Sequence, residues 1–247
     1  MKRVVAIDFI APLAVLALFT MVCRLEDLAI ANRFYSPGGG WIYKHALAVR
    51  LLHRYCQLPG VLLGAAGAVV FGMSFIDRSF RFGRKPGLYL LLVLALGPGL
   101  IVNGVLKNHW GRPRPKQIEQ FGGERKFLAL WEKGSHPRAR SFPSGHAAMG
   151  FYVLTPFFIF RGASRRRAVM WLVGGIAYGS IVGLGRMLQG AHFAGDVLWA
   201  FGFVYLTGLS LAYAFRFQGS SQCEEWAASR SLLGKGDEAV ETMQCEY

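Results

Sequence analysis

The sequence is poor in charged residues. Asp, Glu, Lys and Arg make up 17% of its 247 residues, whereas soluble domains carry about 25%. Hydrophobic residues make up 53% and the mean hydropathy is +0.33, so a single soluble core cannot hold all of the apolar surface. The scarcity of charge excludes an ordinary soluble domain and favours a protein embedded in lipid.

Acidic residues are scarcer still. The chain holds 14 Asp and Glu against 28 Lys and Arg, which gives a formal net charge of +14. A charge of this size indicates an anionic partner, and phospholipid head groups, phosphorylated substrates and nucleic acid all satisfy that requirement. Composition alone does not distinguish the three.

Sequence motifs for metal, nucleotide and disulfide chemistry are missing. The cysteines form no C-x-x-C pair and have no His at metal-ligand spacing, so we expect neither a zinc site nor a disulfide framework. The sequence contains no P-loop and no internal repeat. We therefore expect no metal and no cofactor. The cysteines are Cys23, Cys56, Cys223 and Cys245, and their positions leave open whether Cys23 pairs with Cys56.

Long uncharged runs are what the chain has instead. Six of them approach the ~20 residues that a helix needs to cross ~30 Å of hydrocarbon. They predict an all-α membrane protein with six transmembrane helices in one domain, residues 1–217. The first run is long for a signal peptide, so we expect an uncleaved helix. The runs lie between Arg3 and Arg24, Arg54 and Asp77, Lys85 and Lys107, Arg140 and Arg161, Arg167 and Arg186, and Asp196 and Arg216.

Two short basic loops predict the orientation. Residues 77–85 and 161–167 are rich in Arg, and basic residues near span ends stay on the cytoplasmic side. Both termini are then expected in the cytoplasm, with the polar segment 218–247 as a mobile tail. Residues 107–144 fall on the opposite side although they hold many Lys and Arg. A basic loop on that side is explained if it binds an anion.

Three polar clusters are expected to meet at the membrane surface that faces away from the cytoplasm. The first runs from Lys107 to Arg114-Pro115 at the end of the third span. The second is Ser141 to His146 at the start of the fourth. The third comprises Gly185-Arg186, His192 and Asp196 between the fifth and sixth spans.

These clusters resemble the signature of the type 2 phosphatidic acid phosphatases, which is K-x6-R-P, then P-S-G-H, then S-R-x5-H-x3-D. The resemblance extends from the third span to the sixth, and six spans suit the family. Gly185 stands where the family usually has Ser. The resemblance implies a membrane lipid phosphatase. The matching residues are Lys107, Arg114, Ser144, Gly145, His146, Arg186, His192 and Asp196.

Phosphate chemistry also follows from the residue types. The transition state of phosphoryl transfer spreads negative charge over the equatorial oxygens, and Lys107, Arg114 and Arg186 provide fixed cations for it without a metal. Ser144-Gly145 lies where a loop becomes a helix, so free backbone N–H groups are expected to bind the phosphate. Arg112, between signature positions, is a candidate substrate contact.

His192, Asp196 and His146 are the expected catalytic residues. Asp196 would hold one nitrogen of His192 protonated and leave the other as the nucleophile, either from the same face of a helix or from an adjacent turn. The resemblance implies that His146 donates a proton to the leaving oxygen, and the ordinary pKa of histidine suits this role. The expected reaction is metal-independent and passes through a phosphohistidine.

The substrate is expected to be a lipid. Gly97-Pro98-Gly99, residues 110–123 and residues 185–193 resemble the branch of the family that removes the 4′-phosphate of lipid A in Gram-negative inner membranes. Phosphatidylglycerophosphate, phosphatidic acid and undecaprenyl pyrophosphate stay open as alternatives.

Three other classes of protein account for the sequence less well. A non-enzymatic lipid-phosphate transporter or sensor would need no His–Asp nucleophile, and a catalytically silent scaffold would not need the retained signature residues. Nucleic-acid binding is rejected because the basic residues lie at span ends. We expect no obligatory protein partner.

Overall fold

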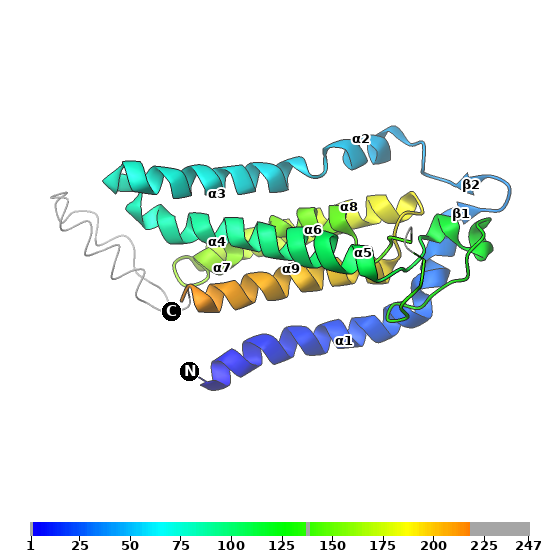
Figure 1. The fold of residues 1–247 in the computed structure, drawn as a ribbon, viewed down its shortest axis with the longest axis horizontal. Helices are drawn as coiled ribbons and strands as arrows, with labels where there is room; N and C mark the ends of the chain where they lie inside the picture. Colours follow the sequence, from blue (N-terminus) through cyan, green and yellow to red (C-terminus); the bar gives the residue numbers. More distant parts are fainter. Residues whose placement is uncertain (1, 137–138, 218–247) are drawn as a thin grey trace.

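Long apolar helices make up most of the computed structural model, which describes residues 2–136 and 139–217 (Figure 1). Five helical segments are long and apolar enough to cross a membrane. The chain is therefore an all-α polytopic membrane protein, as predicted. The five segments are Ile7–Asn32, Leu47–Ile76, Arg78–His109, Arg165–Leu188 and Ala194–Ala214. The predicted tail, residues 218–247, lies outside the described residues.

The first helix is longer than its charge pattern predicted. Helix α1, Lys2–Asn32, continues beyond Arg24, where the uncharged run ends. It does so because Asp27 is buried rather than solvated and because helix-forming Leu and Ala surround it. The extra turns place Asp27 among the residues at one end of the bundle.

The second and third spans are each built from several pieces. Helices α2, Leu47–Tyr55, and α3, Leu58–Ile76, form the second. A 3-10 turn, Arg78–Gly83, leads into α4, Arg84–Leu94, which continues through a π-helical segment, Ala95–Leu106, into α5, Lys107–His109. Pro98 lies inside the π-helical segment, and proline removes a backbone donor and disrupts regular α-helical bonding.

The fourth predicted span is shorter than expected. It consists of α6, Gly145–Tyr152, and α7, Pro156–Phe160, and together they fall below the length of the five long segments. Pro156 opens α7 because it cannot continue the hydrogen bonding of a preceding helix. Helix α6 lies in the middle of the bundle, and Ala147, Phe151 and Tyr152 are buried in the main core. It packs on α8, Arg165–Leu188, and α9, Ala194–Ala214.

Loops and short elements cover one end of the bundle. Strands β1, Tyr35–Ser36, and β2, Gly40–Trp41, form an antiparallel hairpin with Tyr35 opposite Trp41. Two 3-10 turns, Pro115–Gln117 and Glu119–Phe121, lie in the loop after α5. A small apolar cluster joins these pieces to the start of α9. Its buried members are Ala31, Trp41, Ile118, Phe121 and Phe193.

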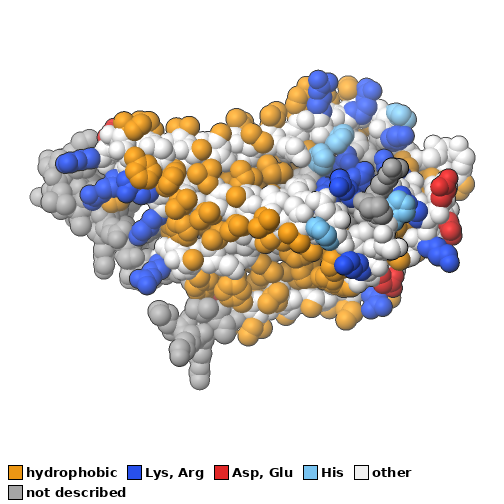
Figure 2. Space-filling model, viewed as in Figure 1, with side chains coloured by type: hydrophobic (Ala, Val, Ile, Leu, Met, Phe, Trp, Pro, Cys, Tyr) orange, Lys and Arg blue, Asp and Glu red, His pale blue; other side chains and the backbone are white. Residues whose placement is uncertain are grey.

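The two ends of the bundle differ in composition. Figure 1 places the start of α1, the α3–α4 connection and the α7–α8 connection at one end, and the hairpin and α5 at the other. Figure 2 shows hydrophobic side chains along the middle, Lys and Arg at both ends, and His at the end that carries the hairpin. The two basic loops thus share an end with the start of α1, where Asp8 accepts hydrogen bonds from Arg161 at 2.7 Å and Tyr213 at 2.6 Å.

Cys23 and Cys56 are both buried free thiols. The open question of a disulfide between them is therefore answered in the negative.

Candidate active site

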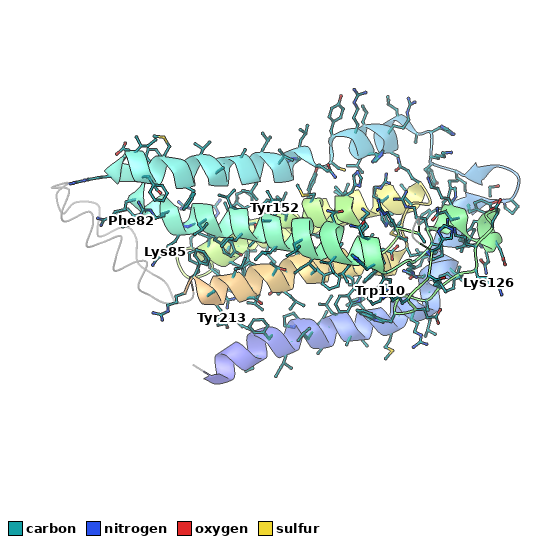
Figure 3. All side chains as sticks on the ribbon, viewed as in Figure 1. Phe82, Lys85, Trp110, Lys126, Tyr152 and Tyr213 are labelled. Atoms are coloured by element: carbon teal, nitrogen blue, oxygen red, sulfur yellow. The ribbon has the colours of Figure 1, made fainter. Side chains whose placement is uncertain are left out.

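The three sequence clusters meet at the hairpin end of the bundle, near the labelled Trp110 in Figure 3. The backbone N–H of Ser144 donates to the carbonyl of Asp196 at 3.1 Å, which joins the second cluster to the third. The N–H of Lys116 donates to the carbonyl of Gly190 at 3.0 Å, which joins the loop after the first cluster to the third cluster. His146 interacts electrostatically with Lys107, Arg186 and His192.

The start of α6 faces the first cluster at close range. Ser144 caps the helix, and its Oγ accepts from the N–H of Ala147 at 3.4 Å. A Cβ atom on Gly145 would lie 2.9 Å from Lys107 Nζ and would also collide with Asn103, so only glycine lets these side chains approach. The first turn of a helix leaves N–H groups without intrahelical partners. Lys107 and these N–H groups can therefore bind the same anion.

One ring nitrogen of His192 is hydrogen-bonded, and the other has no hydrogen-bond partner in the described part of the chain. Its side chain is buried, and Nδ1 lies 2.7 Å from the carbonyl oxygen of Ser141. A carbonyl only accepts, so Nδ1 carries the proton and donates it to Ser141. The lone pair of the neutral ring is then on Nε2, which is the arrangement a nucleophilic histidine needs.

Asp196 supports His192 less directly than the sequence predicted. Helix α9 begins at Ala194, after His192, and the carboxylate Oδ2 lies 3.7 Å from His192 Nδ1. That distance is too long for a hydrogen bond, so Ser141 supplies the nearer acceptor and Asp196 acts electrostatically. Oδ2 instead accepts from the hydroxyl of Ser141 at 2.5 Å and the N–H of Phe193 at 2.8 Å.

Burial controls the protonation of His192. It lowers the pKa of His192 to about 4, the carboxylate of Asp196 opposes this shift, and Arg186 and Lys107 add to it. A neutral imidazole is the form that attacks phosphorus. The environment therefore keeps His192 in its reactive form at neutral pH.

Arg112 lies beneath the site rather than on its surface. Its side chain is fully buried, with Nη1 donating to Asp196 at 2.6 Å, Nη2 to Asp27 at 2.7 Å and Nε to the carbonyl of Leu128 at 3.0 Å. Burial would lower the pKa of Arg112, but the carboxylates of Asp196 and Asp27 raise it above its ordinary value. This placement argues against the expected contact between Arg112 and substrate, because all three guanidinium nitrogens already have protein partners.

Arg186 presents an unused donor. Its Nη1 contacts Nδ1 of His53 at 2.9 Å and also donates to Gln189. Its Nε is buried and has no hydrogen-bond partner in the described part of the chain. A buried unpaired donor is costly, and a phosphate oxygen would satisfy it.

Arg114 completes the cation cluster. It is partly buried and interacts electrostatically with both Lys107 and Arg186. Burial and the neighbouring Arg140 lower the pKa of Arg114. Cations held this close repel one another, and a bound anion would relieve that repulsion.

Two side chains near the site were missed by the sequence analysis. The ring of His53, on α2, lies 4.9 Å from that of His146, centroid to centroid. Asp27 comes from α1 and pairs with Arg112. His53 belongs to no motif and gave no signal. Asp27 follows Arg24 and Glu26 in the sequence, so it resembled an ordinary charge at the end of a span and gave no signal either.

Gly185 has a packing role. A Cβ atom there would lie 2.6 Å from Leu52 Cδ2, so the serine that is usual in the family would require the Leu52 side chain on α2 to move. Within residues 2–136 and 139–217, no three His, Cys, Asp or Glu side chains are grouped so that they could hold a metal ion.

Cations and two histidines gathered at one end of an apolar helical bundle define the class of protein, an integral-membrane phosphatase. Residues 86–220 match the PAP2 superfamily, and the chain belongs to this superfamily. The resemblance predicted from the three motifs is thereby confirmed.

Relatives of known function agree with this class. The chain is 37% identical to a lipid A 4′-phosphatase of Francisella tularensis subsp. novicida, over 77% of this chain and 86% of the relative. It is 32% identical to a lipid A 4′-phosphatase of Rhizobium leguminosarum, over 65% of this chain and 69% of the relative. It is 29% identical to phosphatidylglycerophosphatase B of Bacillus subtilis, over 56% of this chain and 64% of the relative. No solved structure matches the chain. The protein is thus a membrane lipid phosphatase.

Proposed function

We propose that this phosphatase removes the 4′-phosphate of lipid A at the periplasmic face of the inner membrane, without a metal and through a phosphohistidine on His192. The observation that carries the mechanism is the bond from Nδ1 of His192 to the carbonyl of Ser141, which leaves the Nε2 lone pair free. The substrate is supported by relatives named lipid A 4′-phosphatase.

The first half of the reaction transfers the phosphoryl group to the enzyme. His192 Nε2 attacks phosphorus, an N–P bond forms and the P–O bond to the sugar breaks. Burial and the neighbouring Arg186 lower the pKa of His146 to about 3, and the negative charge of a bound phosphate would raise it again, so that a protonated His146 can give its proton to the leaving alkoxide oxygen. Lys107, Arg114 and Arg186 bind the non-bridging oxygens, whose charge they stabilise best in the transition state.

The second half releases inorganic phosphate. Water attacks phosphorus, and His146, now neutral, accepts a proton from that water. The N–P bond breaks and its electron pair returns to His192 Nε2. Since proton transfer and charge stabilisation are both supplied by side chains, no step requires a metal ion.

Phosphate release by the purified detergent-solubilised protein tests the proposal. The panel comprises lipid A, phosphatidylglycerophosphate, phosphatidic acid and undecaprenyl pyrophosphate, each in EDTA, with His192→Ala as the control. We expect release from lipid A, with the 4′ position lost on mass analysis, and no release by the variant. Strict dependence on added Mg²⁺ would contradict the metal-free scheme.

A second substrate has one specific observation in its favour. The relative from Bacillus subtilis is named phosphatidylglycerophosphatase B. Preference for phosphatidylglycerophosphate in the same panel would support the lipid phosphatase activity but contradict lipid A as the substrate. No release from any lipid by folded protein would favour a lipid-phosphate transporter, sensor or silent scaffold.

A further inference from the structure

Three fully buried charged side chains link α1 to the active site. Asp27 lies on α1, Arg112 in the loop after α5 and Asp196 on α9, and the guanidinium of Arg112 bridges the two carboxylates. We propose that Asp27 and Arg112 are positioning residues for the phosphatase reaction: they hold Asp196 and the start of α9 so that His192 stays in its reactive orientation. This inference rests on the proposed role of His192 as nucleophile.

Arg112 fixes which oxygen of Asp196 serves the active site. It occupies Oδ1 at 2.6 Å, which leaves Oδ2 for the hydroxyl of Ser141 at 2.5 Å and the N–H of Phe193 at 2.8 Å. Ser141 supplies the carbonyl that holds His192, and Phe193 follows His192 in the chain. Rotation of the Asp196 carboxylate would therefore disturb the segments on both sides of the nucleophile.

Asp27 holds the same assembly from the opposite side. Its Oδ2 accepts from Arg112 at 2.7 Å, and its Oδ1 accepts from the backbone N–H of Gly195 at 2.9 Å. Gly195 lies in the first turn of α9, between Phe193 and Asp196. One carboxylate thus fixes both the arginine and the backbone that carries Asp196.

A role limited to attaching α1 does not require these charges. Leu16 packs against Gly202, and the indole N–H of Trp199 donates to the hydroxyl of Thr20 at 2.9 Å, so α1 is already held along α9. Burying ions costs free energy, and apolar residues of similar volume often replace such a group without loss of stability. The directional bonds to Gly195 and Asp196 are what apolar packing cannot supply.

The test compares two isosteric substitutions on the same helix. Asp27→Asn removes the buried charge near the site, and Asp8→Asn removes a partly buried ion pair of equal length, 2.7 Å, with Arg161 at the opposite end of α1. Rates are measured on a lipid phosphate that the wild type hydrolyses. Each rate is divided by the amount of folded protein, which size-exclusion chromatography gives. We expect Asp27→Asn to lower kcat about 10- to 100-fold, the size of effect seen when partners that orient metal-bound histidines are lost. KM should stay within about twofold because the phosphate-binding cations are unchanged.

Further variants separate positioning from folding. Asp27→Glu should recover much of kcat, since it restores the carboxylate. Arg112→Lys keeps the charge but loses the planar fork, and it should lower kcat as Asp27→Asn does, which also tests the inference if Asp27→Asn does not fold.

Three results would overturn the inference: unchanged kcat in folded Asp27→Asn or Arg112→Lys, an equal loss in Asp8→Asn, or a loss confined to KM. Failure of the proposed function is a different result, because the wild type would then hydrolyse no lipid phosphate, or His192→Ala would stay active.

Discussion

At the scale of single residues, the site depends on where protons lie. His192 combines burial, an Nδ1–H bond to Ser141 and a pKa of about 4, and together these keep Nε2 unprotonated. The ordinary pKa of histidine is about 6.5, so an exposed histidine would be partly protonated, and unreactive, at mildly acidic pH.

The acid limb of the pH profile is the first prediction. Because His192 stays neutral until the pH approaches 4, the enzyme-derived acid limb of kcat/KM should lie below about pH 5. The measurement is kcat/KM against pH, corrected for the separately titrated ionisation of the substrate phosphate. An acid limb whose enzyme-derived inflection lies between about pH 6 and 7 would contradict the account, whereas a basic limb would report loss of the His146 proton.

Stability should be followed in the same experiment. His192 takes up a proton near pH 6.5 in the unfolded chain, whereas in the folded chain its pKa is about 4. Lowering the pH from about 6.5 to about 4 therefore favours unfolding. Melting temperatures at each pH distinguish loss of fold from protonation of the nucleophile.

The sequence identified the motif residues but not their orientation. The predicted membrane topology and the resemblance to the family signature together brought Lys107, Arg186 and His192 into one predicted site. It could not reveal that the nearest acceptor for His192 is a backbone carbonyl, since every residue has one. Asp27 and His53 come from helices far away in sequence and belong to no motif, so only the fold brings them to Arg112 and Arg186.

At the scale of elements, the uncharged runs of the sequence predicted the positions of the membrane spans. They did not predict how each span is divided into helices. The five long segments fall where uncharged runs occur, because water cannot solvate charged side chains inside the bilayer. The break between α6 and α7 depends on Pro156 and on burial in the centre of the bundle, which charge gaps do not report.

The connection between α8 and α9 positions the nucleophile, and Gly190 is its critical residue. Gly190 has φ +63, and a Cβ atom there would collide with the ring of Trp41. Gly190→Ala should therefore destabilise the protein by more than the ~1–2 kcal/mol of a left-handed alanine, and it should lower activity by displacing His192.

Gly38 offers the matched control for that prediction. It also has a positive φ, +81, but among the described residues no heavy atom other than those of its two chain neighbours lies within 4 Å of the position that a Cβ atom would take. Gly38→Ala should cost only the backbone strain and leave activity intact. Melting temperatures of both variants in detergent give the comparison, and equal losses would contradict the proposed contact with Trp41.

At the scale of the whole molecule, the active site and the basic loops 77–85 and 161–167 lie at opposite ends of the bundle (Figure 1). The positive-inside rule places those loops in the cytoplasm, so the site is predicted to face the periplasm. This orientation would give the enzyme access to lipid phosphates in the outer leaflet of the inner membrane.

Cysteine accessibility tests the orientation. Ser79 is exposed in the 3-10 turn between α3 and α4, and Lys126 is exposed at the opposite end of the bundle (Figure 3), so Ser79→Cys and Lys126→Cys are made in a background lacking Cys223 and Cys245. In intact spheroplasts, a membrane-impermeant maleimide should label Lys126→Cys, whereas Ser79→Cys should react only after permeabilisation. The reverse pattern would place the site in the cytoplasm.

Trapping the phosphoenzyme is the most direct test of the central claim. Lipid A labelled with ³²P at the 4′ position is mixed with the enzyme in EDTA and quenched in alkali, where phosphohistidine survives. The account predicts an alkali-stable, acid-labile label that maps to His192 and is absent from His192→Ala. Phosphate release by the wild type with no label on His192, or turnover by folded His192→Ala, would contradict it.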